Sequence, residues 1–316
     1  MKIMIFIPAL NEAASIARVI NSLPKDLGGY GPPTVLVVDD GSTDGTADAA
    51  RSEGAIVVRH ATNRGVGGAF QTGHQVALEQ GADILVSIDA DGQFDPDEIP
   101  ALLAPLLAGQ TGLVTGCRFG PAGRPANMSK VKYWGNLVVA AVVRSASGTT
   151  LRDVSCGFRA YSREALLHLN LFGKFTYTQE TILDLAFKNI PICEVPVKVR
   201  YFSDRRSRVA GSILRYAMNA GKILVRTVRD FRPFRFFGTL GSGVFLFGAA
   251  LDVWLLVHYL RTGSYSPYKA VGFAGGLLNV CGILLVGLGL LADMLDRMRV
   301  NQERILYLLR KHDLGD

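Results

Sequence analysis

The chain has 316 residues, more than one domain usually contains, so we expect a catalytic domain of about 200 residues and an appended region. Residues 1–200 have 18 Lys and Arg against 19 Asp and Glu, whereas residues 201–316 have 16 against 8, so the net charge of +7 comes entirely from the C-terminal third. That third is also the most hydrophobic part, which favours a lipid bilayer over nucleic acid as a partner. The sequence contains no nucleic-acid-binding motif.

The four cysteines are Cys117, Cys156, Cys193 and Cys281, and no two of them form a CxxC pair. We therefore expect neither a zinc site nor a disulfide framework, and a reducing compartment such as the cytoplasm. The apolar run at residues 3–7 is too short for a signal peptide and predicts a first buried strand.

Short β-rich apolar runs alternate with helical patterns through the first 90 residues, which predicts an α/β fold with a mostly parallel sheet. The expected strands are residues 3–7, 34–38, 55–59 and 84–88, and the expected helices are residues 13–23, 46–53 and 67–80. In such sheets, ligands bind beyond the carboxyl ends of the strands. The polar residues that follow these strands are therefore expected to share one crevice: Asn11, Glu12, Asp39, Asp40, Asp89 and Asp91.

Two carboxylates and an amide follow the strand at 84–88, in the sequence Asp89-Ala90-Asp91-Gly92-Gln93. Oxygen ligands of this kind suit Mg²⁺ or Mn²⁺, which bind through one or two carboxylates and complete their coordination with substrate phosphates. We therefore expect Asp89, Asp91 and Gln93 to hold a divalent metal on a nucleotide diphosphate, where it would stabilise the departing diphosphate. Taken alone, the same residues also fit an ordinary turn.

Four motifs occur in the order and spacing of family 2 glycosyltransferases: residues 7–12 (IPALNE), 38–46 (VDDGSTDGT), 63–65 (NRG) and 89–93 (DADGQ). The chain resembles this family in these motifs, which implies a GT-A fold, Rossmann-like in type, and inversion at the anomeric carbon. The resemblance assigns nucleotide binding to Pro8, Ala9, Asn11, Glu12, Asp39, Asp40, Arg64, Gly65 and Asp89. Asp39 would accept from an imino N–H of the base, a group that uracil and guanine share, so we expect a UDP- or GDP-sugar.

Arg64 begins a glycine-rich run at residues 64–68 that invites comparison with a dinucleotide-binding loop. The run lacks GxGxxG spacing and an acidic residue at the usual distance for a ribose contact, which argues against that site. Two interpretations of Arg64 stay open. It reaches the diphosphate, helped by N–H groups at a helix start, or it belongs to a plain helix N-terminus.

The second half of the domain resembles the dolichyl-phosphate mannose synthase branch of the family at residues 116–119, 153–159, 179–180 and 194–197. With the C-terminal apolar segments, the likeness covers nearly the whole chain and implies polyprenyl phosphate as the acceptor. It assigns the lipid phosphate to Arg118, to Lys130 or Lys132, and to Arg205. The segment Arg205-Arg206-Ser207-Arg208 departs from the Gly-x-Ser-Lys pattern of the branch, and we assign all of its residues to the acceptor phosphate.

The acceptor decides which catalytic groups are needed. A phosphate monoester has a second pKa of about 6, so it is already anionic at neutral pH and needs positioning more than a base. Arg118 would supply that positioning by bidentate contact. A sugar hydroxyl would instead need a general base, for which Asp153, Glu180 and Asp184 are candidates. The residues expected to act in catalysis are Asp91, Arg118, Asp153 and Glu180.

Residues 236–260 contain roughly a dozen Leu, Val and Phe residues, and residues 270–292 contain no charged residue. Each segment is long enough to cross a bilayer core of about 30 Å as a helix. Asp252 is unfavourable within the first segment, and we expect it either to face the second helix near Asn279 or to lie toward one interface. Gly272 and Gly276 have small-xxx-small spacing, which is compatible with a homo-oligomer.

Residues 211–235 alternate basic and apolar positions at helical spacing, with Arg215, Lys222 and Arg226 on one face and Ile213 and Leu224 on another. This pattern predicts an amphipathic helix on a membrane surface, and the alternative is an ordinary helix packed on the catalytic domain. Basic residues are denser outside the two apolar segments than between them, so the positive-inside rule places both ends in the cytoplasm.

We therefore expect a GT-A domain at 1–210, a juxtamembrane helix at 211–235, and a region at 236–316 with two transmembrane helices and a cytoplasmic C-terminal helix. The expected enzyme moves a hexose from a UDP- or GDP-sugar to polyprenyl phosphate at the cytoplasmic face of the cell membrane. Two alternatives stay open: a membrane transferase that extends a glycan or glycolipid, and a catalytically silent scaffold. A structural ion pair is the alternative role for Arg159 and Glu180.

Overall fold

In the computed structural model of the chain, the described residues are 1–120, 123–171, 177–201, 229 and 233–314. The predicted phosphate-binding residues 205–208 and nearly all of the predicted helix at 211–235 lie outside the described residues. The chain divides into two compact units, Met1–Ala220 with Leu306–Asp316, and Gly221–Ile305.

The first unit is built on a seven-stranded sheet in the order β3-β2-β1-β4-β6-β5-β7. Its strands are β1 (Ile3–Ala9), β2 (Thr34–Asp39), β3 (Ile56–Arg59), β4 (Ile84–Ser87), β5 (Leu113–Cys117), β6 (Arg159–Ser162) and β7 (Ile192–Pro196). Neighbouring strands are parallel except at β6, which runs antiparallel to both β4 and β5. The predicted α/β fold with a mostly parallel sheet is confirmed, and the four predicted strands differ from the observed ones by one or two residues at their ends.

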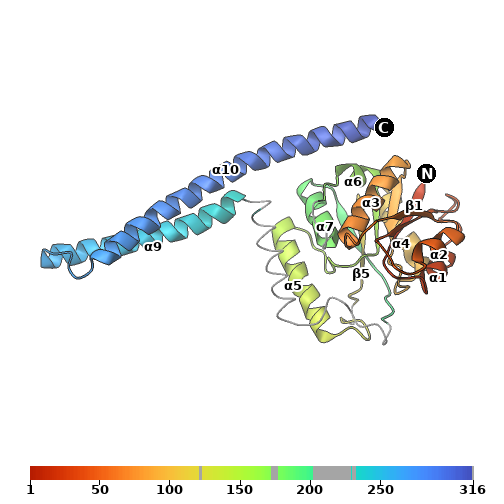
Figure 1. Cartoon of the computed structure of the whole chain (residues 1–316), viewed down its shortest axis with the longest axis horizontal. Coiled ribbons are helices and arrows are strands. Elements are labelled where there is room, and N and C mark those ends of the chain that lie inside the picture. The colour runs from red at the N-terminus through yellow and green to blue at the C-terminus, as the bar shows by residue number, and fades with distance from the viewer. Residues whose placement is uncertain (121–122, 172–176, 202–228, 230–232, 315–316) are drawn as a thin grey trace. The chain divides into compact units, whose positions relative to one another are not determined.

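Helices cover both faces of this sheet, as a buried parallel sheet requires, and Figure 1 shows the two layers. Alternation along β1 explains the arrangement. Ile3, Ile5 and Ile7 belong to the core cluster shared with α1 (Ile16–Asn21), α2 (Thr46–Ser52) and α4 (Ile99–Leu107). On the other face, Phe6 packs edge-on against Phe70 of α3 (Val66–Glu79), with 5.8 Å between ring centroids.

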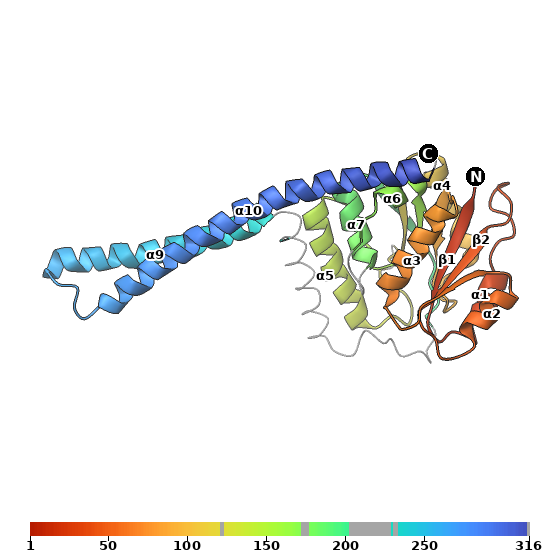
Figure 2. The ribbon, with the colours of Figure 1, turned by 45° about the horizontal axis from the view of Figure 1, so that its top comes forward.

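Helix α1 is shorter than the predicted helix at 13–23, because the chain first forms a turn in which the N–H of Ser15 donates to the carbonyl of Glu12 at 2.9 Å. Three further helices follow the first half: α5 (Lys130–Ser147), α6 (Arg163–His168) and α7 (Tyr177–Phe187), all visible in Figure 2. Helix α5 begins at a Ser129 cap, whose hydroxyl accepts from the N–H of Lys132 at 3.3 Å. It ends at Gly148, which has the left-handed conformation of a helix C-terminus.

The second unit consists mainly of a helical hairpin formed by α9 (Pro233–Thr262) and α10 (Lys269–Asp313). Both helices are long and apolar enough to cross a membrane, with mean hydropathy of 1.9 and 2.1 over their most apolar windows. Only 17% of each window is buried, so most of these apolar side chains are free to contact lipid. Helix α10 runs without a break beyond the predicted span at 270–292, so the predicted C-terminal helix is a continuation of it. Its last residues, Leu306 onward, belong to the first unit.

A polar pair lies inside the hairpin. Asn279 Nδ2 donates to Asp252 Oδ2 at 2.6 Å, which confirms the predicted orientation of Asp252 toward the second helix. Gly272 also faces the hairpin, since a Cβ on it would lie 2.6 Å from Leu255 Cδ2, whereas Gly276 has open space around its Cα. Gly272, one of the two glycines of the small-xxx-small pair, therefore packs within one chain, and the homo-oligomer stays a prediction.

Glycines at seven-residue intervals line the contact between the two helices: Gly241 and Gly248 on α9, and Gly275 and Gly282 on α10. A Cβ on Gly282 would lie 2.8 Å from the carbonyl oxygen of Gly241, and one on Gly248 would lie 2.8 Å from that of Gly275. The two backbones therefore approach so closely that only glycine fits between them.

Gly282→Ala should destabilise the hairpin by about 1 to 3 kcal/mol, because its methyl group would push the helices apart. Gly287→Ala is the matched control, since no atom lies within 4 Å of a Cβ at that position and alanine favours the helix by up to about 1 kcal/mol. Thermal unfolding of the detergent-solubilised chain should show a lower midpoint for the first variant only. Equal midpoints would contradict the close backbone contact.

Candidate functional site

Three parallel strands, β1, β2 and β4, end at the same edge of the sheet, so the polar loops after them converge. Asn11 follows β1, Asp39 ends β2, and Asp89 follows β4. The first two loops are joined directly beyond the strands, where the N–H of Asp40 donates to the carbonyl of Ala9 at 2.9 Å. These loops meet at the carboxyl ends of the strands, where a parallel sheet binds its ligands, and this region is called the crevice below.

Asp39 is completely buried at the end of β2, beside the last residues of β1. Ala9 is its partner in the strand register, and Pro8 precedes Ala9 with a half-buried ring. The Oδ1 atom of Asp39 accepts from the N–H of Ser42 at 2.8 Å. Its Oδ2 atom lies 3.2 Å from Arg59 Nε but accepts no hydrogen bond from the described residues. Asp39 Oδ2 therefore has a charged neighbour in Arg59 but accepts no hydrogen bond from the described residues.

Asn11 and Glu12 fix the loop after β1 against the loop after β2. Asn11 has a left-handed backbone (φ 54°), and its side-chain oxygen accepts from the N–H of Thr43 at 2.9 Å. The N–H of Glu12 donates to Thr46 Oγ1 at 2.9 Å, and its carboxylate accepts from the hydroxyl of Ser15 at 2.6 Å. The observed contacts of these two residues thus shape the edge of the crevice.

Asp40 shapes the next loop. Its Oδ1 atom accepts from the N–H of Arg64 at 2.8 Å and lies 2.7 Å from Nδ1 of His60, a buried ring whose Nε2 is 2.8 Å from Thr72 Oγ1. Arg64 is exposed, and Gly65 begins α3 with φ 82°, a conformation that favours glycine. Asp40 therefore holds the Arg64 loop through Oδ1, and its contact with the nucleotide stays a prediction.

Asp89 is half-buried at the start of the Asp-Ala-Asp-Gly-Gln loop and is crowded from one side. A Cβ on Gly157 would lie 3.1 and 3.2 Å from the two carboxylate oxygens of Asp89, and 3.3 Å from the hydroxyl of Tyr177. Burial, and then the neighbouring charge of Asp91, raises the pKa of Asp89 to about 6. The ionised form of Asp89 is therefore disfavoured, first by burial and then by the negative charge of Asp91.

The donor atoms at this loop fit a hard divalent cation. The N–H of Gln93 donates to Asp91 Oδ1 at 3.0 Å, and the Gln93 carbonyl accepts from the N–H of Arg200 at 2.9 Å, so the loop is anchored. Within the described residues, no group of three or more His, Cys, Asp or Glu side chains is arranged for a metal. A cation here would depend on two carboxylates and on oxygens from a ligand, which is the manner in which Mg²⁺ and Mn²⁺ bind phosphates.

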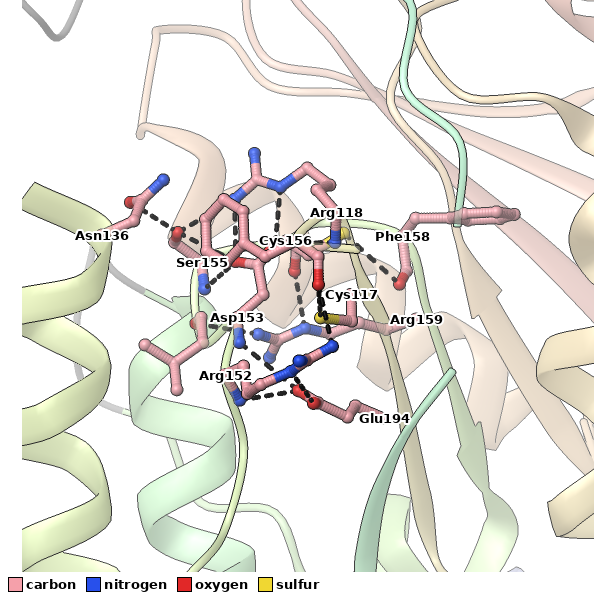
Figure 3. Close-up of polar contacts among 12 residues, drawn as sticks. Cys117, Arg118, Asn136, Arg152, Asp153, Ser155, Cys156, Phe158, Arg159 and Glu194 are labelled. Carbon is pink, nitrogen blue, oxygen red and sulfur yellow. Dashed lines mark hydrogen bonds and ion pairs between the residues drawn. The ribbon is translucent and has the colours of Figure 1, made fainter. Parts of the chain in front are cut away.

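On the other side of the crevice, Arg118 and Asp153 form a buried bidentate ion pair, drawn in Figure 3. Arg118 Nε donates to Asp153 Oδ2 at 2.7 Å, and Nη2 donates to Oδ1 at 2.9 Å. Nη2 also donates to Ser155 Oγ at 3.0 Å, whereas Nη1 has only a long contact of 3.4 Å with the hydroxyl of Tyr201. The edge of the guanidinium formed by Nε and Nη2 is therefore held firmly, and Nη1 can still donate a hydrogen bond to a stronger acceptor.

This pairing sets the ionisation of both side chains. Burial alone would lower the pKa of Arg118 and raise that of Asp153, but their mutual attraction holds the pKa of Arg118 well above its usual value and the pKa of Asp153 below its usual value. Asp153 has both oxygens on the guanidinium and is fully buried. These contacts show that Asp153 orients Arg118, and its predicted part in catalysis stays a prediction.

The two lysines proposed for the phosphate differ in position. Lys130 is exposed at the start of α5, whereas Lys132 is half-buried and its Nζ lies 4.9 Å from the centre of the Tyr201 ring. Burial, then the charge of Arg118, lowers the pKa of Lys132, while Asp91, Asp153 and Asp89 oppose that shift. Lys132 is therefore the lysine close to the crevice.

Arg159, fully buried at the start of β6, joins two segments. It donates to the carbonyls of Cys156 at 2.7 Å and Val154 at 3.0 Å, and to Thr178 O at 2.6 Å and Thr181 Oγ1 at 2.8 Å. These contacts fix the loop before β6 against the first turn of α7. All four hydrogen bonds go to carbonyl or hydroxyl oxygens, and the alternative of an ion pair with Glu180 stays untested.

The other two candidate bases lie on α7. Glu180 is half-buried in its first turn. Asp184 is buried, forms an ion pair with Lys188 at 2.8 Å and accepts from the N–H of Asn170 at 3.0 Å. These contacts give Asp184 a structural role.

With this geometry known, the chain can be compared with characterised proteins. The model of the family described as Glycosyl transferase family 2 matches residues 4–169, more than half of the chain. The chain belongs to glycosyltransferase family 2. The match covers β1 through α6 and therefore includes the crevice-lining loops described above.

Two relatives of this glycosyltransferase have names that state an acceptor. An undecaprenyl-phosphate mannosyltransferase from Micrococcus luteus is 31% identical over 231 residues, which cover 68% of this chain and 90% of that protein. A UDP-N-acetylglucosamine–dolichyl-phosphate N-acetylglucosaminyltransferase from Methanococcus voltae is 34% identical over 219 residues, which cover 63% and 86%. These two proteins differ in the sugar that they transfer.

A solved structure is also similar to this glycosyltransferase. Glucosyl-3-phosphoglycerate synthase from Mycobacterium tuberculosis, in complex with Mn²⁺, UDP-glucose and phosphoglyceric acid, aligns with a TM-score of 0.55 at 26% identity. The alignment covers 72% of this chain and 78% of that one. It supports the GT-A fold that the motifs imply.

Sequence patterns alone do not distinguish two residues that lie at the glycosyltransferase crevice. Gly157 occurs in a recognised motif, but its close contact with Asp89 depends on two segments far apart in the chain. Tyr201 contacts both Arg118 and Lys132, and no local pattern distinguishes it from a core aromatic. A glycine followed by an aromatic in the Gly157 motif was the one available signal of a tight approach.

Gly157→Ala should lower turnover by about tenfold, because the added methyl group would displace the Asp89 carboxylate by a few tenths of an ångström and small misplacements are costly in catalysis. Initial rates should be measured with the thermal midpoint as a control for folding. Normal turnover in a folded variant would show that the position of Asp89 is not limiting.

Proposed function

We propose that the chain is an inverting, metal-dependent glycosyltransferase that moves a hexose from a UDP- or GDP-sugar to polyprenyl phosphate. The observation that carries this proposal is the separation of charge across one crevice. Asp89 and Asp91 give one side its negative charge, while Arg118 and Lys132 give the other side positive charge. The two cations lie near enough to Asp89 to offset part of the rise in its pKa. Two relatives are named for transfer to a polyprenyl phosphate, which supports this acceptor.

The donor side suits a nucleotide diphosphate sugar. The Oδ2 atom of Asp39, which accepts no hydrogen bond from the described residues, would accept the imino N–H of a uracil or guanine ring, and this choice of base is open. A Mg²⁺ or Mn²⁺ ion held by Asp89 and Asp91 would act as a Lewis acid for the leaving diphosphate. The similar synthase contains both Mn²⁺ and UDP-glucose, which supports the metal. Gln93 anchors the same loop through its backbone.

On the acceptor side, Arg118 and Lys132 would bind the lipid phosphate and hold one of its oxygens toward the anomeric carbon. That oxygen forms the new bond to the anomeric carbon as the bond to the nucleoside diphosphate breaks, which inverts the configuration. The acceptor is anionic at neutral pH and gives up no proton in this step. Both carboxylate oxygens of Asp153 accept hydrogen bonds from Arg118, which agrees with a reaction that needs no carboxylate base.

The location that we propose is the cell membrane, with the α9–α10 hairpin in the bilayer and the catalytic unit in the cytoplasm. Support comes from the exposed apolar surface of both helices and from the excess of basic residues outside the hairpin.

The proposal is tested with the full-length chain in lipid nanodiscs, a panel of UDP- and GDP-sugars, and two acceptors that differ only in the phosphate. Sugar should be transferred to polyprenyl phosphate and not to polyprenol, and a chelator should abolish the reaction. Transfer to polyprenol at a similar rate would contradict the acceptor, and full turnover in excess chelator would contradict the metal. Glu180→Gln should retain most activity; a loss of several orders of magnitude would favour the transferase that extends a glycan hydroxyl.

Lys132→Ala should raise the KM for polyprenyl phosphate about tenfold, because a charge-assisted contact with the phosphate is lost. Lys130→Ala is the matched variant, two residues away and exposed, and its effect on that KM should be clearly smaller. The KM for the sugar nucleotide should change little in both variants. A larger effect at Lys130 would reverse the assignment.

Metal binding should weaken as the pH falls through about 6, because a proton competes with the cation for Asp89, whose pKa is raised to about 6. Above this pH the carboxylate is ionised and affinity should be nearly constant; below it, affinity should fall about tenfold per pH unit. Calorimetric titration of Mn²⁺ with UDP present measures this dependence. Affinity that does not change across the range would exclude Asp89 as a ligand.

A further inference from the structure

The outer face of α5 is an exposed apolar stripe. Trp134, Val138 and Ala141 are spaced so that they share one side of the helix, and the side chains of Trp134 and Val138 are 66% and 53% exposed. No large apolar side chain among the described residues of the first unit is more exposed than Trp134. The opposite side of α5 is buried against the unit. A stripe of this kind is costly in water unless something covers it.

The segment of the chain that contains this stripe carries charge of one sign only. Residues 99–152 contain no Asp or Glu, and their basic residues are Arg118, Arg124, Lys130, Lys132, Arg144 and Arg152. Lys130 and Arg124 are exposed near the beginning of α5. A surface that combines an exposed tryptophan with exposed basic residues is complementary to anionic lipid headgroups, where tryptophan is enriched and each basic residue contributes to attraction.

The stripe and the acceptor cations lie at the same end of α5. Lys132 and Trp134 are two residues apart, which is about 3 Å along the axis, and they lie on opposite sides of a helix about 10 Å thick. A surface in contact with Trp134 would therefore be only one helix thickness from Lys132. A phosphate at headgroup level could reach Lys132 and Arg118 past the first turn of the helix.

We propose that the outer face of α5, formed by Trp134, Val138, Ala141 and Lys130, is a docking surface for the anionic lipid bilayer. The inference rests on the proposed function in one respect, namely that the acceptor is a lipid phosphate. Docked in this way, α5 lies in the interface with its apolar stripe among the headgroups. The catalytic unit then meets its acceptor at a fixed depth, in addition to being tethered by the hairpin.

The chain offers a direct reporter of this contact, because it contains only two tryptophans, Trp134 and Trp254. In Trp254→Phe, fluorescence comes from Trp134 alone. In nanodiscs with anionic lipid, phospholipids brominated near the headgroup should quench this emission more strongly than lipids brominated near the chain ends. Quenching should rise with the fraction of anionic lipid and fall with salt. Trp134→Phe, which leaves Trp254 of α9, is the positive control for contact with lipid.

Two results would overturn the proposal. In one, neither brominated lipid quenches Trp134 while acrylamide quenches it freely, which means that the stripe faces water. In the other, Trp134 is shielded from acrylamide and still unaffected by brominated lipid, which means that a protein surface covers it.

An activity measurement tests whether docking of α5 on the bilayer helps the enzyme to bind its lipid acceptor. Trp134→Asp should raise the KM for long-chain polyprenyl phosphate in nanodiscs about tenfold, with no change in the KM for the sugar nucleotide. Tyr30→Asp is the matched control: Tyr30 is 44% exposed and precedes β2, at the edge of the sheet opposite the crevice. Equal effects of the two variants would contradict the docking role. Lipid quenching in a chain that transfers no sugar would count against the proposed function and leave the docking surface standing.

Discussion

A guanidinium and a carboxylate that are both almost removed from water are stable only as a pair, because the desolvation of each ion costs several kcal/mol. Arg118 and Asp153 satisfy this constraint in bidentate form, with side-chain exposures of 8% and 0%. The pair joins the end of β5 to the loop before β6. Arg152 extends the connection to β7, since its N–H donates to the Glu194 carboxylate at 2.7 Å. The position of Arg118, which we propose as an acceptor-binding cation, therefore depends on one buried ion pair.

The same loop reaches the donor side of the crevice within a few residues. Gly157 contacts the Asp89 carboxylate, and Arg159 fastens the end of the loop to the first turn of α7. A shift of this loop would move Arg118 and Asp89 together. In the proposed reaction, this connection would hold the acceptor cation and the metal-binding carboxylate at a fixed separation, as the approach of two phosphate groups requires.

The placement of Asp39 and Asp89 at strand ends could be predicted from sequence, because an apolar strand that ends in an acidic residue is a local pattern. The roles of neighbouring residues could not be predicted in this way. Asp40 follows Asp39 in the same motif, yet its carboxylate binds the N–H of Arg64, 24 residues away. Likewise, Lys130 and Lys132 are equivalent in the motif, and only the Ser129 cap and the packing of α5 turn Lys132 toward the crevice. Such distinctions depend on contacts between distant segments.

The central claim is that the lipid phosphate and the donor diphosphate occupy opposite sides of this crevice. It is tested most directly by an experimental structure of the full-length chain in nanodiscs with Mn²⁺, UDP and polyprenyl phosphate, a complex that cannot react. The account predicts oxygens of the lipid phosphate on Arg118 and Lys132, and the UDP diphosphate joined through the metal to Asp89 and Asp91. A UDP diphosphate bound to Arg118, or a lipid phosphate bound away from both cations, would contradict it.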